Sequence, residues 1–235
     1  MKVALLLLAA GRGTRFGGPI PKAWLELAGR PLLAHCIERL HRALPPGSTA
    51  ETVILVHDDD RPAYVGPWLD RLRLLAGGGP VQVVTGGPTR QSSMLNGLAA
   101  IGADCDLVLI HDAARALLPI AATTACIAAA EREGAALLAI PAPDTLKRVE
   151  ADRVCGTIDR TGVWLAQTPQ VIRRDLLRRA AAHAEATGFV GTDDVALVEH
   201  LGERVVAVPG SATNLKITRP EDLPLAAAIL STGLA

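Results

Sequence analysis

Glycines and cationic side chains gather in one short segment near the start of the chain. Residues 8–22 read Leu-Ala-Ala-Gly-Arg-Gly-Thr-Arg-Phe-Gly-Gly-Pro-Ile-Pro-Lys, directly after an apolar run. Small residues let backbone N–H groups approach a phosphate, and Arg12, Arg15 and Lys22 would add positive charge. The glycine spacing misses the dinucleotide fingerprint by one position, and the segment lacks the Gly-Lys-Ser/Thr ending of a P-loop. We therefore expect a phosphate-binding loop of neither standard kind.

A second glycine-containing segment, residues 86–93, reads Gly-Gly-Pro-Thr-Arg-Gln-Ser-Ser and precedes a predicted helix. Thr89 has the side chain of a helix N-cap, so a plain turn followed by a cap is one interpretation. The functional alternative places Gly87 and Ser93 against a nucleotide base or sugar.

An acid and an arginine follow another apolar run, in the segment His111-Asp-Ala-Ala-Arg115. On a loop beside the glycine-rich segment, Asp112 could hold Mg²⁺ and Arg115 a phosphate. The alternative is an Asp–Arg pair with a purely structural role. We expect His111 to pack or to form a structural hydrogen bond, since no neighbouring group needs a proton shuttle.

Other polar segments are less specific, because each alone is consistent with a loop, a helix cap or a solvated charge. They are residues 144–148, 159–160, 167–170, 191–194 and 214–220. The acidic run 58–60 is expected to be a solvated turn.

The sequence has no Gly-x-Ser-x-Gly elbow, no His-Glu-x-x-His and no His/Cys cluster with zinc spacing. Glycine loops with basic residues suit phosphoryl or nucleotidyl transfer, where catalysis is mainly positioning and charge stabilisation.

The charge balance narrows the class of partner. The 235 residues contain 24 Lys plus Arg and 24 Asp plus Glu, so the formal net charge is zero, and 49% of residues are hydrophobic. This hydrophobic content excludes a disordered chain, and the lack of a basic excess argues against a nucleic-acid partner. Residues 1–25, however, hold four Lys or Arg and no acid. A local basic pocket suits one small triphosphate.

Cysteine use and hydropathy indicate a cytoplasmic protein that does not enter a membrane. The four cysteines (Cys36, Cys105, Cys126, Cys155) are widely spaced and are expected to be small core residues in a reducing compartment. No apolar run reaches the roughly 18 residues that a membrane helix needs. The apolar run 3–10 imitates a signal peptide, but it is short and no convincing cleavage site follows it.

Short apolar runs alternate with helical patterns along the chain. Strands are expected at 3–8, 52–56, 81–84, 107–110, 135–140 and 205–208, and helices at 31–44, 62–75, 89–101, 120–133, 173–186, 193–201 and 220–230. Runs without polar alternation indicate strands buried on both faces, as in a parallel sheet. The order predicts an α/β fold, a three-layer α/β/α sandwich around a Rossmann-like, mostly parallel sheet, in a single domain over residues 1–235.

The alternation breaks after Pro141. Residues 144–160 are polar and helix-poor, and two short strands are expected around residues 150–152. Such a segment has too little apolar surface to pack alone. We therefore expect a projecting β-hairpin arm, at about residues 142–163, that would be stable if another chain covered it.

Taken in order, these segments resemble the 2-C-methyl-D-erythritol 4-phosphate cytidylyltransferases of the non-mevalonate isoprenoid pathway. The matching motifs are residues 9–15 with Pro21-Lys22, 86–93, 111–115, 144–147, 168–170, 192–193 and 214–222. Many nucleotidyltransferases share the first motif, whereas Asp-Ala-Ala-Arg (112–115) and Asn-x-Lys-x-Thr (214–218) are narrower signals.

The resemblance implies that CTP and 2-C-methyl-D-erythritol 4-phosphate give 4-diphosphocytidyl-2-C-methyl-D-erythritol and pyrophosphate, with Mg²⁺. A phosphate oxygen of the sugar phosphate would attack the α-phosphate of CTP in line, and it needs no general base because it is already ionised. Matching by position, Arg15, Lys22 and Lys216 would be the catalytic residues that neutralise charge at the α-phosphate.

The remaining site residues also follow from the resemblance. The nucleotide would be bound by Ala9, Ala10, Gly11, Gly13, Gly87, Ser93 and Asp112, and Asp112 would also position Mg²⁺ or the ribose. The sugar phosphate would be bound by Arg115, Thr145, Arg160, Thr168, Thr192 and Lys216. Members of the family are homodimers that exchange the projecting arm, so Thr145 and Arg160 could serve the partner's site.

Two residues depart from the family pattern. Ala116 stands where the family usually has proline, which loosens the turn that aims Arg115, and Pro88 has no N–H to offer a base.

Three alternatives stay open from the sequence. A ribitol-5-phosphate cytidylyltransferase would use the same acceptor residues. A dinucleotide-binding dehydrogenase has the wrong glycine spacing here, and Asp58 is its best candidate acid after the second strand. A non-catalytic nucleotide sensor would not need Arg15, Lys22 and Lys216 together.

Overall fold

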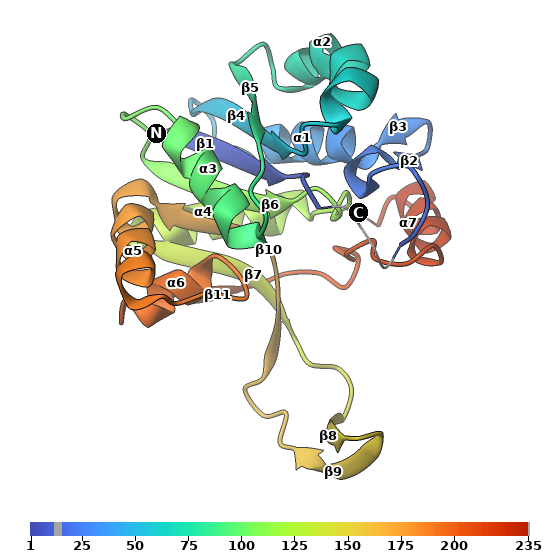
Figure 1. The fold of residues 1–235 in the computed structure, drawn as a ribbon, viewed down its shortest axis with the longest axis vertical. Coiled ribbons are helices and arrows are strands. Elements are labelled where there is room, and N and C mark those ends of the chain that lie inside the picture. Colours follow the sequence, from blue (N-terminus) through green and yellow to red (C-terminus); the bar gives the residue numbers. More distant parts are fainter. Residues whose placement is uncertain (12–15, 235) are drawn as a thin grey trace.

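The computed structural model describes residues 1–11 and 16–234. Seven strands form a central sheet in the order β11-β7-β10-β6-β1-β4-β5. They are β1 (Lys2–Leu8), β4 (Thr49–Val56), β5 (Val81–Thr85), β6 (Leu107–Asp112), β7 (Ala135–Pro141), β10 (Trp164–Arg173) and β11 (Val206–Pro209). The helices are α1 (Leu32–Ala43), α2 (Gly66–Leu75), α3 (Arg90–Ala100), α4 (Ile120–Glu133), α5 (Arg174–Thr187), α6 (Val195–His200) and α7 (Asp222–Ser231). Figure 1 shows this arrangement.

The sheet is mostly parallel, as predicted. β1 pairs in parallel with β4 on one side and with β6 on the other, β4 pairs in parallel with β5, and β7 pairs in parallel with β11. The chain passes from β1 outward to β4 and β5 and then returns to β6 on the other side of β1, so the strand order reverses there. In open α/β sheets, ligands bind beyond the carboxyl ends of the strands at such a reversal.

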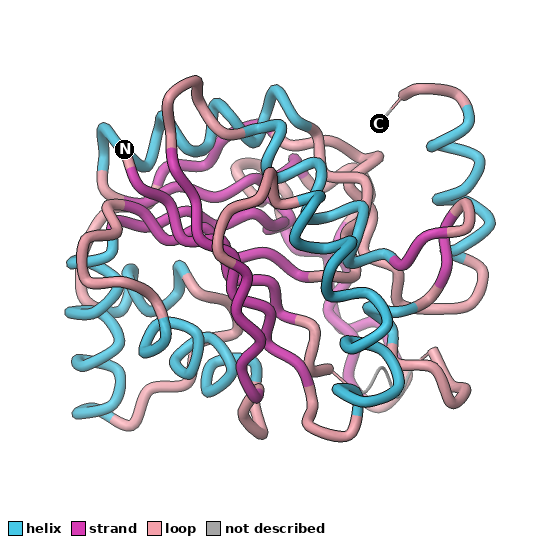
Figure 2. The backbone as a smooth tube through the Cα atoms, turned by 90° about the horizontal axis from the view of Figure 1, so that it is seen from above, coloured by secondary structure: helices cyan, strands magenta, loops and turns pink. Residues whose placement is uncertain are grey.

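Helices cover both faces of the sheet (Figure 2), which confirms the three-layer sandwich. Alternate residues of β1 point to opposite faces: Leu5 and Leu7 pack with α1 and α4, whereas Ala4 and Leu6 pack with α3 and α5. All four are fully buried. The apolar run of β1 is therefore continuous because each of its faces contacts a helical layer.

The prediction missed β10, which lies in the middle of the sheet. β10 is antiparallel to both β6 and β7, and residues 167–172 of it are buried. Pro169 argued against a central strand in the sequence, because proline has no N–H to donate to the hydrogen-bond ladder of a sheet. The pairing of β10 with β7 shifts register between Ala166 and Gln170, and this irregularity accommodates the proline.

The predicted hairpin projects from the body of the molecule (Figure 1). It consists of β8 (Leu146–Glu150) and β9 (Arg153–Ile158), which pair with each other and with no other described strand. The apolar side chains of Val149 and Val154 are 55% and 64% exposed. The arm thus has no core within this one chain.

Small features differ from the predictions. A two-stranded ribbon, β2 (Glu26–Leu27) with β3 (Arg30–Pro31), follows the short helix η1 (Lys22–Trp24), and a turn of π-helix, η2 (Arg61–Val65), precedes α2. Of the cysteines, Cys155 lies exposed on the arm, because β9 has no covering layer. Asp60, expected to be solvated, is buried. Among the described residues, no helix is both long and apolar enough to cross a membrane.

Candidate active site

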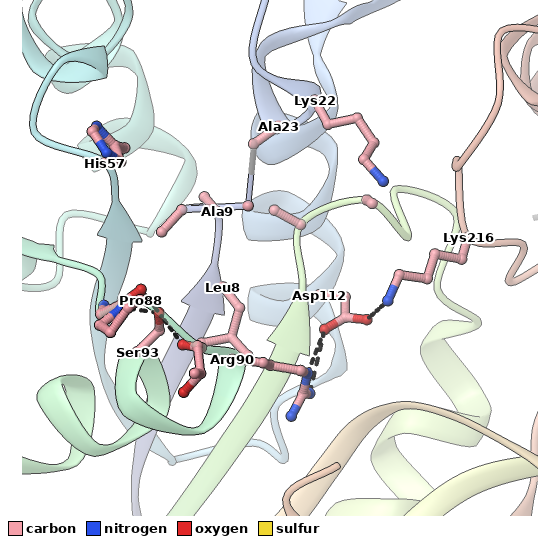
Figure 3. A pocket seen from close by; sticks show the side chains of 16 residues that line it. Leu8, Ala9, Lys22, Ala23, His57, Pro88, Arg90, Ser93, Asp112 and Lys216 are labelled. Atoms are coloured by element: carbon pink, nitrogen blue, oxygen red, sulfur yellow. Dashed lines mark hydrogen bonds and ion pairs between the residues drawn. The ribbon is translucent and has the colours of Figure 1, made fainter. Parts of the chain in front are cut away.

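A cavity of about 580 Å³ lies where β1, β4 and β6 end. The described residues that line it are Leu8, Ala9, Ala10, Gly11, Lys22, Ala23, His57, Gly87, Pro88, Thr89, Arg90, Ser93, Asp112, Ala113, Ala114 and Lys216. Figure 3 shows these side chains from close by. The cavity thus stands at the reversal of strand order, where the fold class binds its ligands.

The structure brings together most of the residues predicted to bind the nucleotide. Ala9, Ala10, Gly11, Lys22, Gly87, Ser93, Asp112 and Lys216 all line the cavity. Gly13 and Arg15 lie outside the described residues. Arg115, Thr145, Arg160, Thr168 and Thr192 do not line it.

The turn at Gly86-Gly87 packs tightly between β1 and α3. A Cβ atom on Gly86 would lie 2.3 Å from the Cβ of Ala10, so only glycine allows this contact. The Ser93 hydroxyl accepts a 2.9 Å hydrogen bond from the N–H of Gly87 and lies 2.9 Å from the carbonyl of Thr89. Thr89 also caps α3 in a capping box with Ser92. The structure confirms the capped turn, and this turn forms a wall of the cavity.

Asp112 is the acid of the cavity and is held by two cations. Its Oδ2 accepts a 2.6 Å hydrogen bond from Nζ of Lys216, and its Oδ1 lies 3.3 Å from both Nε and Nη2 of Arg90. Burial favours the neutral acid, but Arg90 and Lys216 outweigh burial and hold the pKa of Asp112 below its usual range. The carboxylate is therefore ionised at neutral pH.

Thr168 fixes the backbone beside that carboxylate. Its Oγ1 accepts a 3.1 Å hydrogen bond from the N–H of Asp112 and lies 3.0 Å from Nδ1 of His111. The other ring nitrogen of His111 lies 3.0 Å from the carbonyl of Arg115. Burial lowers the pKa of His111 to about 4, so the ring is neutral. His111 thus forms structural hydrogen bonds, as predicted.

Lys216 comes from a long loop that Asn214 anchors. The Asn214 side chain is fully buried, and its Nδ2 donates to the carbonyl of Thr168 at 2.9 Å and to Oε1 of Gln167 at 3.1 Å. Further along, Oδ2 of Asp222 accepts from the backbone N–H of Thr218 at 2.7 Å. These contacts fix both ends of the segment that carries Lys216.

Arg115 contacts this loop and is not among the described residues that line the cavity. Its Nη1 donates a 2.6 Å hydrogen bond to the carbonyl of Asn214, and its Nε is buried with no hydrogen-bond partner among the described residues. Burial lowers the pKa of Arg115, against the pull of Asp112. The guanidinium therefore stabilises the loop that carries Lys216.

The other predicted acceptor residues lie apart from the cavity. Thr192 is exposed in the loop 189–194 between α5 and α6. Thr145 and Arg160 are exposed at the base of the arm, where Arg160 donates a hydrogen bond to the carbonyl of Pro143. None of these three side chains is among the described residues that line the cavity within one chain.

The sequence assigned no role to three ionisable residues that the structure places at or beside the cavity. His57 and Arg90 line it, and Asp194 is buried behind it with its Oδ2 2.7 Å from Nη2 of Arg90. His57 directly follows β4, so the rule on the carboxyl ends of parallel strands could have identified it. No sequence signal pairs Arg90 with Asp194, because they are far apart along the chain.

A magnesium ion would find one carboxylate here. Asp112 is the one Asp or Glu among the described lining residues, and no group of three or more His, Cys, Asp or Glu side chains is gathered in the described ranges. Mg²⁺ keeps several waters and is usually held by one or two carboxylates together with substrate phosphates. Oδ1 of Asp112 accepts from both Nε and Nη2 of Arg90, whereas Oδ2 has a second lone pair beyond the one that Lys216 uses. The donor set fits an ion that arrives with a triphosphate.

Comparison with known proteins identifies the family. The family model for 2-C-methyl-D-erythritol 4-phosphate cytidylyltransferase matches residues 3–232. The chain belongs to this cytidylyltransferase family. It is therefore a nucleotidyltransferase.

Relatives of that name agree over nearly the whole length. The cytidylyltransferase of Geotalea uraniireducens is 42% identical over 99% of this chain and 98% of its own, and that of Chromobacterium violaceum is 43% identical over 96% of each. The crystal structure of the Thermus thermophilus cytidylyltransferase is 34% identical, covers 98% of this chain and 100% of its own, and superimposes with a TM-score of 0.80. The fold and the family thus agree.

Proposed function

We propose that this chain transfers the cytidylyl group of CTP to 2-C-methyl-D-erythritol 4-phosphate and releases pyrophosphate. The observation that carries the proposal is the cavity at the end of β1, where Lys22 and Lys216 both line the wall beside Asp112 in a chain of this family. Figure 3 shows both lysine side chains on the Asp112 side of the pocket.

In the proposed reaction the lysines stabilise developing charge. A phosphate oxygen of the acceptor attacks the α-phosphorus of CTP, the new P–O bond forms, and the bond to the β-phosphate oxygen breaks. Lys22 and Lys216, with Arg15, place positive charge where negative charge builds up on the phosphate oxygens. Preorganised cations cost no reorganisation during the reaction. The step needs no general base, because the attacking phosphate oxygen is already ionised.

The rest of the cavity holds the nucleotide. Ala9, Ala10, Gly11 and Gly13 line the triphosphate, and Gly87 and Ser93 contact cytosine. A small pocket of backbone donors and acceptors rejects purines by size. Asp112 holds Mg²⁺, which would neutralise phosphate charge when bound.

The acceptor lies against the other side of the site. Arg115, Thr168, Thr192 and Lys216 contact the sugar phosphate from the same chain, and Thr145 and Arg160 from the arm of a second copy. Residues 1–235 thus work as one nucleotidyltransferase domain with a dimerisation arm at about 142–163, in a cytoplasmic homodimer. The exposed apolar side chains of the arm support this arrangement.

Pyrophosphate release tests the proposal directly. The purified protein with CTP and Mg²⁺ is given either 2-C-methyl-D-erythritol 4-phosphate or ribitol 5-phosphate, and we expect faster turnover of the first. Faster turnover of ribitol 5-phosphate would show that ribitol 5-phosphate is the acceptor. The relatives named above are 2-C-methyl-D-erythritol 4-phosphate cytidylyltransferases and do not favour that outcome. No release with either acceptor would refute the proposed activity.

A further inference from the structure

Arg90 connects two acids from different parts of the fold. Its Nη2 lies 2.7 Å from Oδ2 of Asp194 and 3.3 Å from Oδ1 of Asp112. Asp112 ends β6 and lines the nucleotide cavity, whereas Asp194 immediately precedes α6. One guanidinium, on the first residue of α3, therefore joins the cavity to the loop 189–194.

The same turn of α3 holds that loop at a second point. Oε1 of Gln91 accepts a 2.9 Å hydrogen bond from the N–H of Gly191, and its Nε2 lies 3.3 Å from the carbonyl of Phe189. Thr192 follows directly and is exposed. Two neighbouring side chains of α3 thus contact the loop on both sides of Thr192.

The central strand β10 supplies the third attachment. Oε1 of Gln170 accepts from the N–H of Asp194 at 2.9 Å and of Val195 at 3.0 Å, and its Nε2 donates to Oδ2 of Asp193 at 2.8 Å. Gln170 is 1% exposed. These hydrogen bonds fix the backbone at Asp194, and the side chain of Asp194 contacts Arg90.

The ion pair is buried on one side. The side chain of Asp194 is 1% exposed and that of Arg90 is 29% exposed. Among the described residues, Arg90 is the one cation that pairs with Asp194. Removing one partner of a buried pair leaves an uncompensated charge, which is strongly destabilising for the segment that carries it. The planar fork of arginine suits a bridge between two carboxylates better than lysine does.

We propose that Arg90 and Asp194 are positioning residues for the acceptor. The pair holds the loop 189–194, and with it Thr192, in a fixed relation to Asp112 and the nucleotide. This inference rests on the proposed function, in which Thr192 contacts the sugar phosphate. Arg90 contacts both Asp112, in the nucleotide cavity, and Asp194, beside the acceptor loop 189–194. Asp194 acts on the acceptor loop alone.

Steady-state kinetics of Asp194→Asn separate the two sides. The substitution keeps the shape and removes the charge. We expect the KM for 2-C-methyl-D-erythritol 4-phosphate to rise about tenfold, which corresponds to about 1.4 kcal/mol, while the KM for CTP stays within about twofold. Arg90→Lys, which cannot bridge both acids, should raise both KM values. Equal changes in both constants for Asp194→Asn, or no change in either, would overturn the assignment.

An exposed ion pair nearby is the matched control. Arg179 and Glu203 lie 2.7 Å apart between α5 and the residues after α6, and both side chains are more than two-fifths exposed. Glu203→Gln therefore removes a charge from the same region without touching the loop 189–194. Its KM values should match those of the unmodified protein.

Hydrogen exchange tests the inference without any substrate. The amides of Gly191, Asp194 and Val195 are hydrogen-bonded in the free protein. In Asp194→Asn and Arg90→Lys we expect these amides to exchange faster, while amides of β1 keep their protection. Unchanged exchange in the loop would refute the positioning role, whatever activity the protein has. Failure of the unmodified protein to turn over the sugar phosphate would instead refute the proposed function alone.

Discussion

Nζ of Lys216 lies 2.6 Å from Oδ2 of Asp112, although 104 positions separate the two residues in the chain. Asp112 ends a central strand, and Lys216 comes from a loop that Asn214 anchors to β10. The ammonium group is thus held at the cavity wall before any substrate arrives. A cation fixed in this way can stabilise a phosphate in a transition state without first reorganising.

Lys216→Ala should slow the chemical step. The substitution removes the positive charge beside the α-phosphate, so we expect kcat to fall by about 10²-fold or more, while the KM for CTP changes less because Lys22 remains. The initial rate of pyrophosphate release at several CTP concentrations measures both constants. Arg219→Ala, at an exposed side chain three residues away, is the control and should keep the unmodified rate. Near-normal turnover of Lys216→Ala would contradict the assigned role.

Asp112→Asn should change the dependence on magnesium. The amide keeps the size of the side chain but loses the negative charge that a divalent cation needs. We expect the Mg²⁺ concentration for half-maximal rate to rise, and kcat to fall even at saturating Mg²⁺ because Lys216 loses its ionic partner. A titration of the rate against Mg²⁺ measures this, with Asp70→Asn, at a 93% exposed carboxylate on α2, to report the effect of losing a carboxylate elsewhere. Full activity in the presence of excess chelator would show that the proposed metal is not needed.

The sequence predicted the parallel part of the sheet because its strands are unbroken apolar runs between helical patterns. It also predicted several of the residues that line the cavity, since the loops after β1, β5 and β6 meet at one edge of the sheet. It missed β10, where Pro169 and a register shift interrupt the strand pattern. It gave no role to Arg90 and Asp194, because an ion pair between distant segments leaves no local spacing to detect.

Thr168→Val should destabilise the fold. The Thr168 hydroxyl accepts from the buried N–H of Asp112 and contacts Nδ1 of His111, and valine satisfies neither. Leaving buried polar groups unpaired costs about 1–3 kcal/mol for each. We expect a lower free energy of unfolding in urea, whereas Thr168→Ser, which keeps the hydroxyl, should recover most of it. Equal stability of the valine and serine variants would show that the hydroxyl contributes little.

The buried ring of His35 should make stability depend on pH. Its Nε2 lies 2.8 Å from the carbonyl of Leu27, and burial lowers the pKa of His35 below its ordinary value of 6.5. The unfolded chain therefore binds more protons than the folded chain below that value. The contribution of His35 is fully present above about pH 6.5 and is lost as pH falls toward the folded-state pKa.

Urea unfolding at pH 7.5 and pH 5.5 measures this effect. His35→Gln keeps a donor for the Leu27 carbonyl and cannot titrate. We expect the free energy of unfolding to fall less between the two pH values in this variant than in the unmodified protein. The same slope in both would assign the pH dependence to other groups.

The arm should hold two copies of the chain together. Val149 and Val154 are more than half exposed on β8 and β9, with no covering layer in one copy. Placing Asp at both positions should convert a dimer into a monomer in analytical ultracentrifugation, because charge is costly in an apolar contact. Leu74→Asp, at a residue that is 77% exposed on α2, should leave the association state unchanged. A monomeric unmodified protein would refute the arm contact.

Mixing two inactive variants tests whether the arm completes the partner's site. Arg160→Ala should impair acceptor binding, and Lys216→Ala should impair the chemical step. If Arg160 serves the other copy, a mixed dimer contains one site with both residues intact, so activity should return after the variants are unfolded and refolded together. If Arg160 serves its own chain, each site in the mixed dimer lacks one residue and activity stays low. The structure favours the first outcome, because no residue of the arm 142–163 is among the described residues that line the Asp112 cavity of the same chain.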